Sequence, residues 1–105
     1  MSPASDALCR ALGAAFAGFG GRVTVEARAR RRWASVTFAG ERHEVMMRLE
    51  GPDARAAIDG FLDGLADREF DVPGHIVADI AVTAVEDDGE TLIRLRLEAL
   101  TVEAS

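Results

Sequence analysis

The sequence predicts a single α+β domain over residues 1–105, an antiparallel five-stranded sheet with two helices packed on one face. Three observations predict this fold. The chain has 105 residues and a mass of 11.2 kDa, which is the size of one domain. Two segments carry apolar residues at helical spacing, and five others alternate apolar with polar residues. Turn residues separate these segments in the order α-β-β-β-α-β-β, and no linker or repeat interrupts them.

The first helix is expected over residues 3–17, and Gly20-Gly21 ends it. The alternation of Val23 and Val25 with polar residues then predicts a first strand. The run ARARRR, residues 27–32, is expected to form a basic turn. A second strand follows over residues 33–38, then a short turn at Gly40-Glu41, and a third strand over residues 43–50.

Gly51-Pro52-Asp53 breaks the third strand and opens the second helix. Residues 68–75 are expected to form a loop that ends in a tight turn. The last element is a hairpin of residues 76–85 and 91–102. A two-residue Asp88-Gly89 turn would place Val82 opposite Leu95, and a four-residue loop would oppose Asp79 to Arg96. The first register is preferred because Asp-Gly is a strong hairpin signal.

The composition excludes several classes of protein. Twelve basic and eighteen acidic residues give a net charge of -6 and a pI near 4.8, and every basic residue is Arg. The absence of Lys and Tyr indicates a GC-rich, bacterial coding sequence. One cysteine, Cys9, cannot form an intramolecular disulfide. No apolar run approaches the roughly 20 residues of a membrane span. We therefore expect a cytoplasmic protein with no membrane association.

No set of residues predicts catalysis, and neither a cofactor nor a metal site is expected. Asp71, His75 and Asp79 are four residues apart, but Pro73-Gly74 forbids the helix that would bring them together. His43 is expected at the surface beside a turn. Ser35 lies on a strand without the turn that exposes a nucleophilic serine. A non-enzymatic role is the preferred interpretation.

The sheet face away from the helices is predicted to carry more apolar residues than a face meant only for water, which indicates an interface. We therefore expect a homodimer that buries this face or pairs along a strand edge, and a further protein partner is possible. The residues expected to mediate contact are the following: Arg30, Arg31, Arg32, Trp33, Met46, Leu92, Arg96 and Leu100.

Arginines beside Trp33 also match nucleic-acid contacts, and the first five elements resemble the order of a double-stranded-RNA-binding domain. That family has a lysine-rich start to its second helix, where this chain reads GPDARAAID with Arg55 alone. Because the chain is also acidic, nucleic acid is disfavoured as a partner. Binding that falls when the arginines are neutralised would be needed to support it.

The complete element order and low pI resemble the small acidic dimeric chaperones of type III secretion, which implies a chaperone-like interaction module. An alternative is a small-ligand-binding or enzymatic domain similar to the cystatin-like fold, with a pocket between the first helix and the sheet. Its lining would be Phe16, Phe38, Met47 and Phe61. Fold alone does not decide between these functions.

Overall fold

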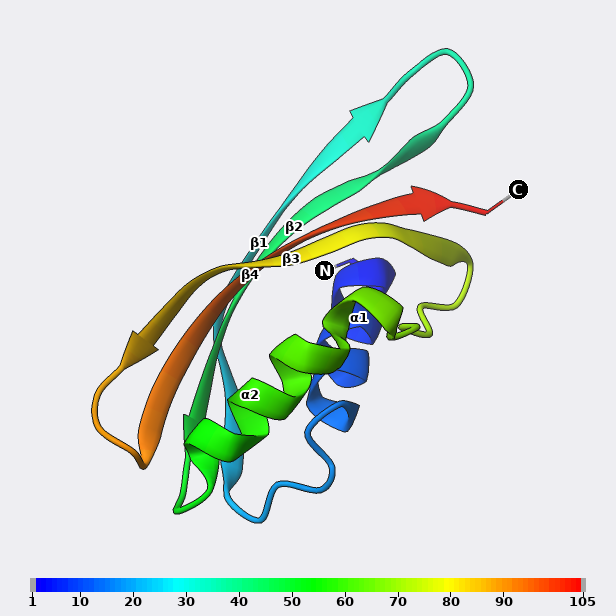
Figure 1. Ribbon diagram of the computed structural model, residues 1–105. Coiled ribbons are helices and arrows are strands. Elements are labelled where there is room, and N and C mark those ends of the chain that lie inside the picture. Colours follow the sequence, from blue (N-terminus) through cyan, green and yellow to red (C-terminus); the bar gives the residue numbers. More distant parts are fainter. Residues whose placement is uncertain (1, 105) are drawn as a thin grey trace.

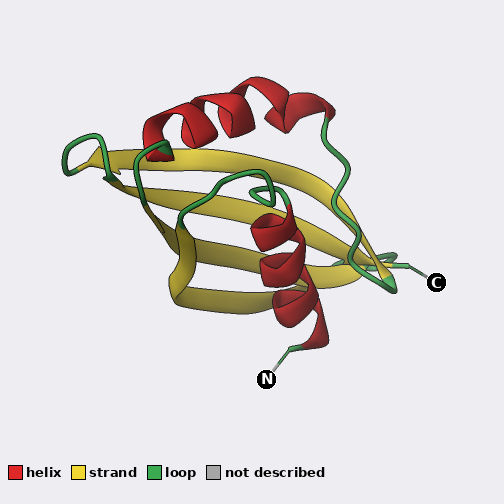
Figure 2. Ribbon diagram, turned by 90° about the horizontal axis from the view of Figure 1, so that it is seen from below, coloured by secondary structure: helices red, strands yellow, loops and turns green. Residues whose placement is uncertain are grey.

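A computed structural model describes residues 2–104 as two helices packed on one antiparallel sheet (Figure 1). The described elements are α1 (Pro3–Ala14), β1 (Arg22–Ala34), β2 (Ala39–Glu50), α2 (Ala54–Gly64), a short 3-10 helix η1 (Leu65–Asp67), β3 (His75–Asp87) and β4 (Leu92–Glu103). The strand order is β1-β2-β4-β3, so two hairpins join through β2 and β4. Figure 2 shows both helices on the same side of the sheet.

The α+β class is confirmed, but the prediction of five strands is wrong: the sheet has four, in the order α-β-β-α-β-β. The run ARARRR is not a turn but the middle of β1, which continues to Ala34. The turn lies at residues 35–38, where the Ser35 hydroxyl accepts hydrogen bonds from the amides of Thr37 (3.4 Å) and Phe38 (3.0 Å). This local capping closes the hairpin after the arginines.

The turn expected at Gly40-Glu41 is also wrong, because both residues lie inside β2, paired with Trp33 and Arg32 of β1. The backbone at Gly40 passes so close to its neighbours that a Cβ would overlap the Thr101 carbonyl oxygen. Glycine is therefore required here by close approach of two strands, not by a turn.

Each helix forms for a local reason. Ser2 caps α1 by accepting a hydrogen bond from the Ser5 amide (3.2 Å), and Pro3 occupies the first helical position. In α2 the buried positions Ala54, Ile58 and Phe61 recur every three or four residues. The α1 helix ends at Ala14, three residues earlier than expected, and a turn leads on to Gly20-Gly21.

The core lies between the helices and the inner face of the sheet. Alternate residues of β2 and β4, from Val45 to Leu49 and from Ile93 to Leu97, meet Leu8, Leu12 and Phe61 there. Phe16, two residues after the end of α1, stacks on Phe61 of α2 with ring centroids 4.8 Å apart, so the turn that follows α1 packs on α2.

The hairpin of β3 and β4 has a different register from the one preferred. A four-residue loop, residues 88–91, joins the strands, so Val82 pairs with Leu97, not Leu95, and Asp79 pairs with Leu100. Bulges at Ala78 and Thr83 each shift the pairing by one residue. As a result Val77 and Val85 pair with inner-face residues of β4 and do not belong to the opposite face.

Candidate functional site: the outer face of the sheet

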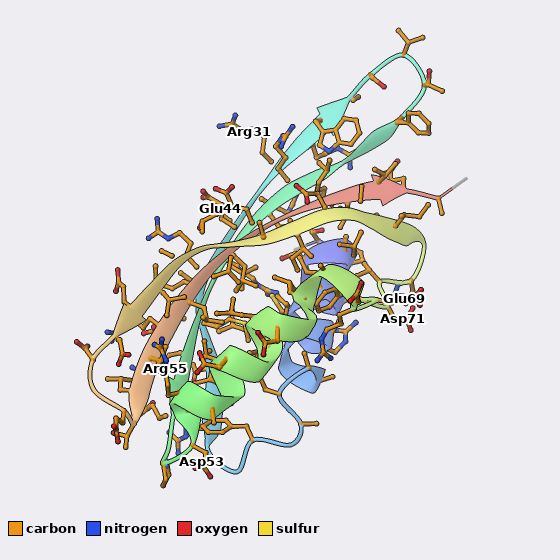
Figure 3. The ribbon with its side chains drawn as sticks, viewed as in Figure 1. Arg31, Glu44, Asp53, Arg55, Glu69 and Asp71 are labelled. Atoms are coloured by element: carbon orange, nitrogen blue, oxygen red, sulfur yellow. The ribbon has the colours of Figure 1, made fainter. Side chains whose placement is uncertain are left out.

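The candidate site is the outer face, defined here as the sheet face away from the helices. Directly paired residues share a face, so the register gives six rows of side chains across it, and the four rows nearest the β1–β2 turn form the candidate site. The apolar row is Trp33, Gly40, Val102 and Ile76; the arginine row is Arg31, Arg42, Leu100 and Asp79; the glutamate row is Ala29, Glu44, Glu98 and Ala81; the methionine row is Ala27, Met46, Arg96 and Ala84. Figure 3 shows Arg31 and Glu44 projecting on this side, away from the helices.

Two neighbouring rows in the middle of this face hold like charges directly opposite each other. Arg31 of β1 pairs with Arg42 of β2, and Glu44 of β2 pairs with Glu98 of β4. Like charges in opposed positions destabilise a sheet. Among residues 2–104 none of these four side chains forms an ion pair. The centre of the outer face therefore holds charges of both signs that form no ion pair within the described chain.

Nearer the β3–β4 turn the same face is electrostatically satisfied. Glu26 contacts both Arg94 (3.0 Å) and Arg48 (3.5 Å), Arg94 also contacts Asp88 (3.2 Å), and Arg48 contacts Glu50 (3.0 Å). The hydrogen bond from Arg94 to Glu26 raises the pKa of the Arg94 guanidinium. The charged side chains near the β3–β4 turn therefore form ion pairs, whereas those of the arginine and glutamate rows do not within residues 2–104.

A hollow of about 420 Å³ opens over the arginine and glutamate rows. Its charged walls include Arg31, Arg42, Glu44, Asp79 and Glu98, and alanines line it as well. The small side chains of Ala29 and Ala81 at both ends of the glutamate row create this space. The hollow has room for side chains of both charges.

Apolar side chains gather at the end of the outer face next to the β1–β2 turn. The Trp33 ring lies against Gly40, because a Cβ there would come within 3.1 Å of it. Ile76 is 61% exposed, and Phe38 in the turn is 57% exposed. Exposed apolar side chains that gather at one end of a face are typical of a contact surface.

Six of the eight residues that the sequence predicts for interaction lie on the outer face, spread along the length of the sheet. The six residues at outer-face strand positions are Arg31, Trp33, Met46, Leu92, Arg96 and Leu100. Arg30 and Arg32 belong to the inner face, where they lie 3.9 Å from Glu41 and 3.7 Å from Glu103. Sequence reasoning misses Arg42 because the turn expected at Gly40-Glu41 leaves it outside the third strand. Glu44 lies within that predicted strand, but the register that opposes it to Glu98 is not predicted.

The residues of the alternative pocket do not all lie together. Phe16 and Phe61 stack in the core beside Met47, which is fully buried, and these side chains fill the space between α1 and the sheet. Phe38 lies in the β1–β2 turn, outside this core cluster.

A buried polar cluster lies under the N-terminus of α1, on the inner face. The Ser2 hydroxyl contacts both carboxylate oxygens of Glu41 (2.8 and 2.9 Å), and Arg30 approaches the same carboxylate. A carboxylate beside a helix N-terminus is favoured by the helix dipole. Because Thr101 donates to the Glu41 carbonyl oxygen, its hydroxyl accepts from His43 Nε2 (3.0 Å).

The prediction that His43 lies at the surface is wrong, because its side chain is 2% exposed within this cluster. Its Nδ1 has no hydrogen-bond partner among residues 2–104. Burial lowers the pKa of His43, and the nearby Glu41 carboxylate opposes this only in part. The folded protein therefore favours the neutral imidazole.

Because folded His43 favours the neutral imidazole, the free energy of unfolding should depend on pH. As the pH falls below the ordinary histidine pKa of 6.5, the unfolded chain takes up a proton that folded His43 resists, so the free energy of unfolding should fall. The contribution is complete above that pH and decreases by at most about 1.4 kcal/mol per pH unit below it. Urea denaturation between about pH 5 and pH 8 measures this slope. The slope should flatten in His43→Gln but persist in His75→Gln; equal slopes in both variants would contradict the assignment.

In residues 2–104 no helix is long and apolar enough to cross a membrane, and no three His, Cys, Asp or Glu residues are grouped to hold a metal ion. No family model, curated protein or solved structure matches this chain.

Proposed function

We propose that the protein acts without catalysis, as a homodimeric protein-interaction module whose two copies join through their outer faces. The observation that carries this proposal is the pair of adjacent rows with unpaired charge of opposite sign, Arg31 with Arg42 and Glu44 with Glu98. A second copy offers both signs at the same spacing. It can therefore set a carboxylate against Arg42 and a guanidinium against Glu44 at the same time.

The symmetry of the contact follows from these rows. A two-fold axis in the interface plane, parallel to the rows and midway between them, places Arg42 of each copy over Glu44 of the other. Such a contact is isologous, so each pair occurs twice. An axis along the strands would instead set Glu44 against Glu98 of the second copy, and the like charges disfavour it.

The same axis also matches the apolar end of the face. It lays the apolar row of one copy on the methionine row of the other, so Met46 meets the surface around Gly40 and Trp33. Four strands and six rows cover about 750 Å² per copy at ordinary strand spacings. A stable interface buries about 800 Å² per partner, so the outer face is large enough.

Light scattering over a range of protein concentrations tests this proposal. At micromolar concentration the mass should be about twice 11.2 kDa, and it should decrease toward 11.2 kDa on dilution. A mass that stays at 11.2 kDa throughout would contradict the proposal. As a control, Arg10→Glu on α1 should leave the dimer intact, because Arg10 is exposed and lies outside the outer face.

A further inference from the structure

The two edges of the sheet differ in regularity. β1 and β3 are the edge strands, and each has 13 residues. In β3 the bulges at Ala78 and Thr83 interrupt the pairing twice. In β1 the pairing is unbroken from Ala27 to Ala34. Bulges protect an edge from further pairing, so β1 is the edge that remains suited to receive a strand.

The outward backbone groups of β1 can be identified from the turn. The Ser35 amide donates to the Phe38 carbonyl oxygen (2.7 Å), so it points toward β2. Amide directions alternate along a strand, and those of Arg28, Arg30 and Arg32 therefore point away from β2. On that side β1 pairs with no strand of residues 2–104.

The arginine side chains along β1 determine which kind of strand can pair with this edge. Arg28, Arg30 and Arg32 have carboxylate neighbours but keep 36%, 39% and 65% of their side chains exposed, and Arg31 forms no ion pair within the described chain. Pairing with β1 of a second copy would oppose arginine to arginine, which is unfavourable. An incoming strand with a carboxylate at every second position would set its carboxylates beside Arg28, Arg30 and Arg32, which share one face.

We propose that the free edge of β1, from Ala27 to Ala34, binds an extended acidic peptide segment as a fifth strand of the sheet. Main-chain hydrogen bonds to Arg28, Arg30 and Arg32 hold the segment, and its carboxylates contact the arginine side chains. This edge is separate from the Arg42 and Glu44 contacts of the dimer. Strand addition at β1 and dimerisation through the outer face can therefore be tested separately, and a negative result for one does not contradict the other.

A fluorescent eight-residue peptide of alternating Glu and Val tests strand addition by fluorescence anisotropy at low salt. The matched control is the same peptide with every backbone amide N-methylated, which keeps the charge but cannot donate hydrogen bonds. Loss of at least two bonds of about 1 kcal/mol each should weaken binding roughly 30-fold. Bound peptide should also slow hydrogen exchange at the amides of Arg28, Arg30 and Arg32.

The side-chain part of the proposal has its own variants. Arg32→Gln should weaken peptide binding, whereas Arg10→Gln on α1 should not. Equal binding of the parent and N-methylated peptides would overturn strand addition, because charge alone would then explain it. Absence of binding would overturn the proposal as well. The arginines would then serve only to prevent other strands from pairing with this edge. Displacement of the peptide by a single-stranded RNA that binds more tightly would favour nucleic acid and overturn the proposal.

Discussion

Replacing Phe61 with alanine is expected to lower the free energy of unfolding by about 3–5 kcal/mol. Phe61 is 2% exposed, and its ring stacks on Phe16 and lies 6.0 Å from the Arg68 guanidinium. The substitution removes the ring that packs on Phe16 within the core and leaves a cavity. Domains of this size have about 5–15 kcal/mol of stability in total, so the loss is a large fraction.

Urea denaturation followed by far-ultraviolet circular dichroism measures this loss. Leu62→Ala is the matched control, because Leu62 is the next residue of α2 and is 38% exposed. Its effect should stay within about 1 kcal/mol, as is usual at a largely exposed position. Similar losses for the two variants would show that α2 does not bury the face described here.

Charge reversal on the outer face is expected to break the dimer without harming the fold. Arg42→Glu places a carboxylate over Glu44 of the second copy at two symmetric positions, and like charges there should raise the dissociation constant about 100-fold. Within one copy the same change opposes a carboxylate to Arg31, which should stabilise the sheet by about 0.2–1 kcal/mol. Glu44→Arg should act likewise, because Glu44 lies opposite Glu98.

These opposite effects separate an interface residue from a structural one. Light scattering reports the mass of each variant, and denaturation at low protein concentration reports the stability of one copy. A variant that is both monomeric and less stable than the parent chain would indicate a role in folding. A variant that stays dimeric would place the interface elsewhere.

Local pattern predicts the elements whose apolar residues alternate or recur without interruption. The α2 helix has Ala54, Ile58 and Phe61 at helical spacing, and β4 alternates from Ile93 to Leu97. Both agree with the structure because one face of each element packs on a single core. The turn at residues 72–75 is confirmed too: the His75 amide donates to the Val72 carbonyl oxygen (2.9 Å), and Gly74 has a positive φ of 77°.

Errors arise where a strand carries charge or a bulge. The arginines of β1 resemble a turn because their partners, Asp6, Glu41 and Glu103, are distant in the sequence. His43 resembles a surface residue because its cover, the start of α1, is equally distant. Strict alternation along β3 fails at Ala78 and Thr83, and an inserted residue leaves no signal in the sequence.

The outer-face site is predictable only in part. Trp33, Met46 and Leu100 stand at alternating positions of their strands, and the sequence identifies them as interaction residues. It does not identify Arg42 and Glu44, because their role depends on β2 beginning at Ala39 and on the register with β1 and β4. The opposition of like charges is a property of paired strands and is absent from any single segment.

Mixing the Arg42→Glu and Glu44→Arg variants tests the self-complementary interface most directly. Each variant alone should be monomeric. In an equimolar mixture the new glutamate of one chain faces the new arginine of the other, and the retained Glu44 of the first chain faces the retained Arg42 of the second. The two-fold arrangement thereby restores both contacts. Light scattering should then give a mass of about twice 11.2 kDa for the mixture and 11.2 kDa for each variant alone. A mixture that remains at 11.2 kDa, while the parent chain is dimeric, would contradict the pairing of Arg42 with Glu44 across the two copies.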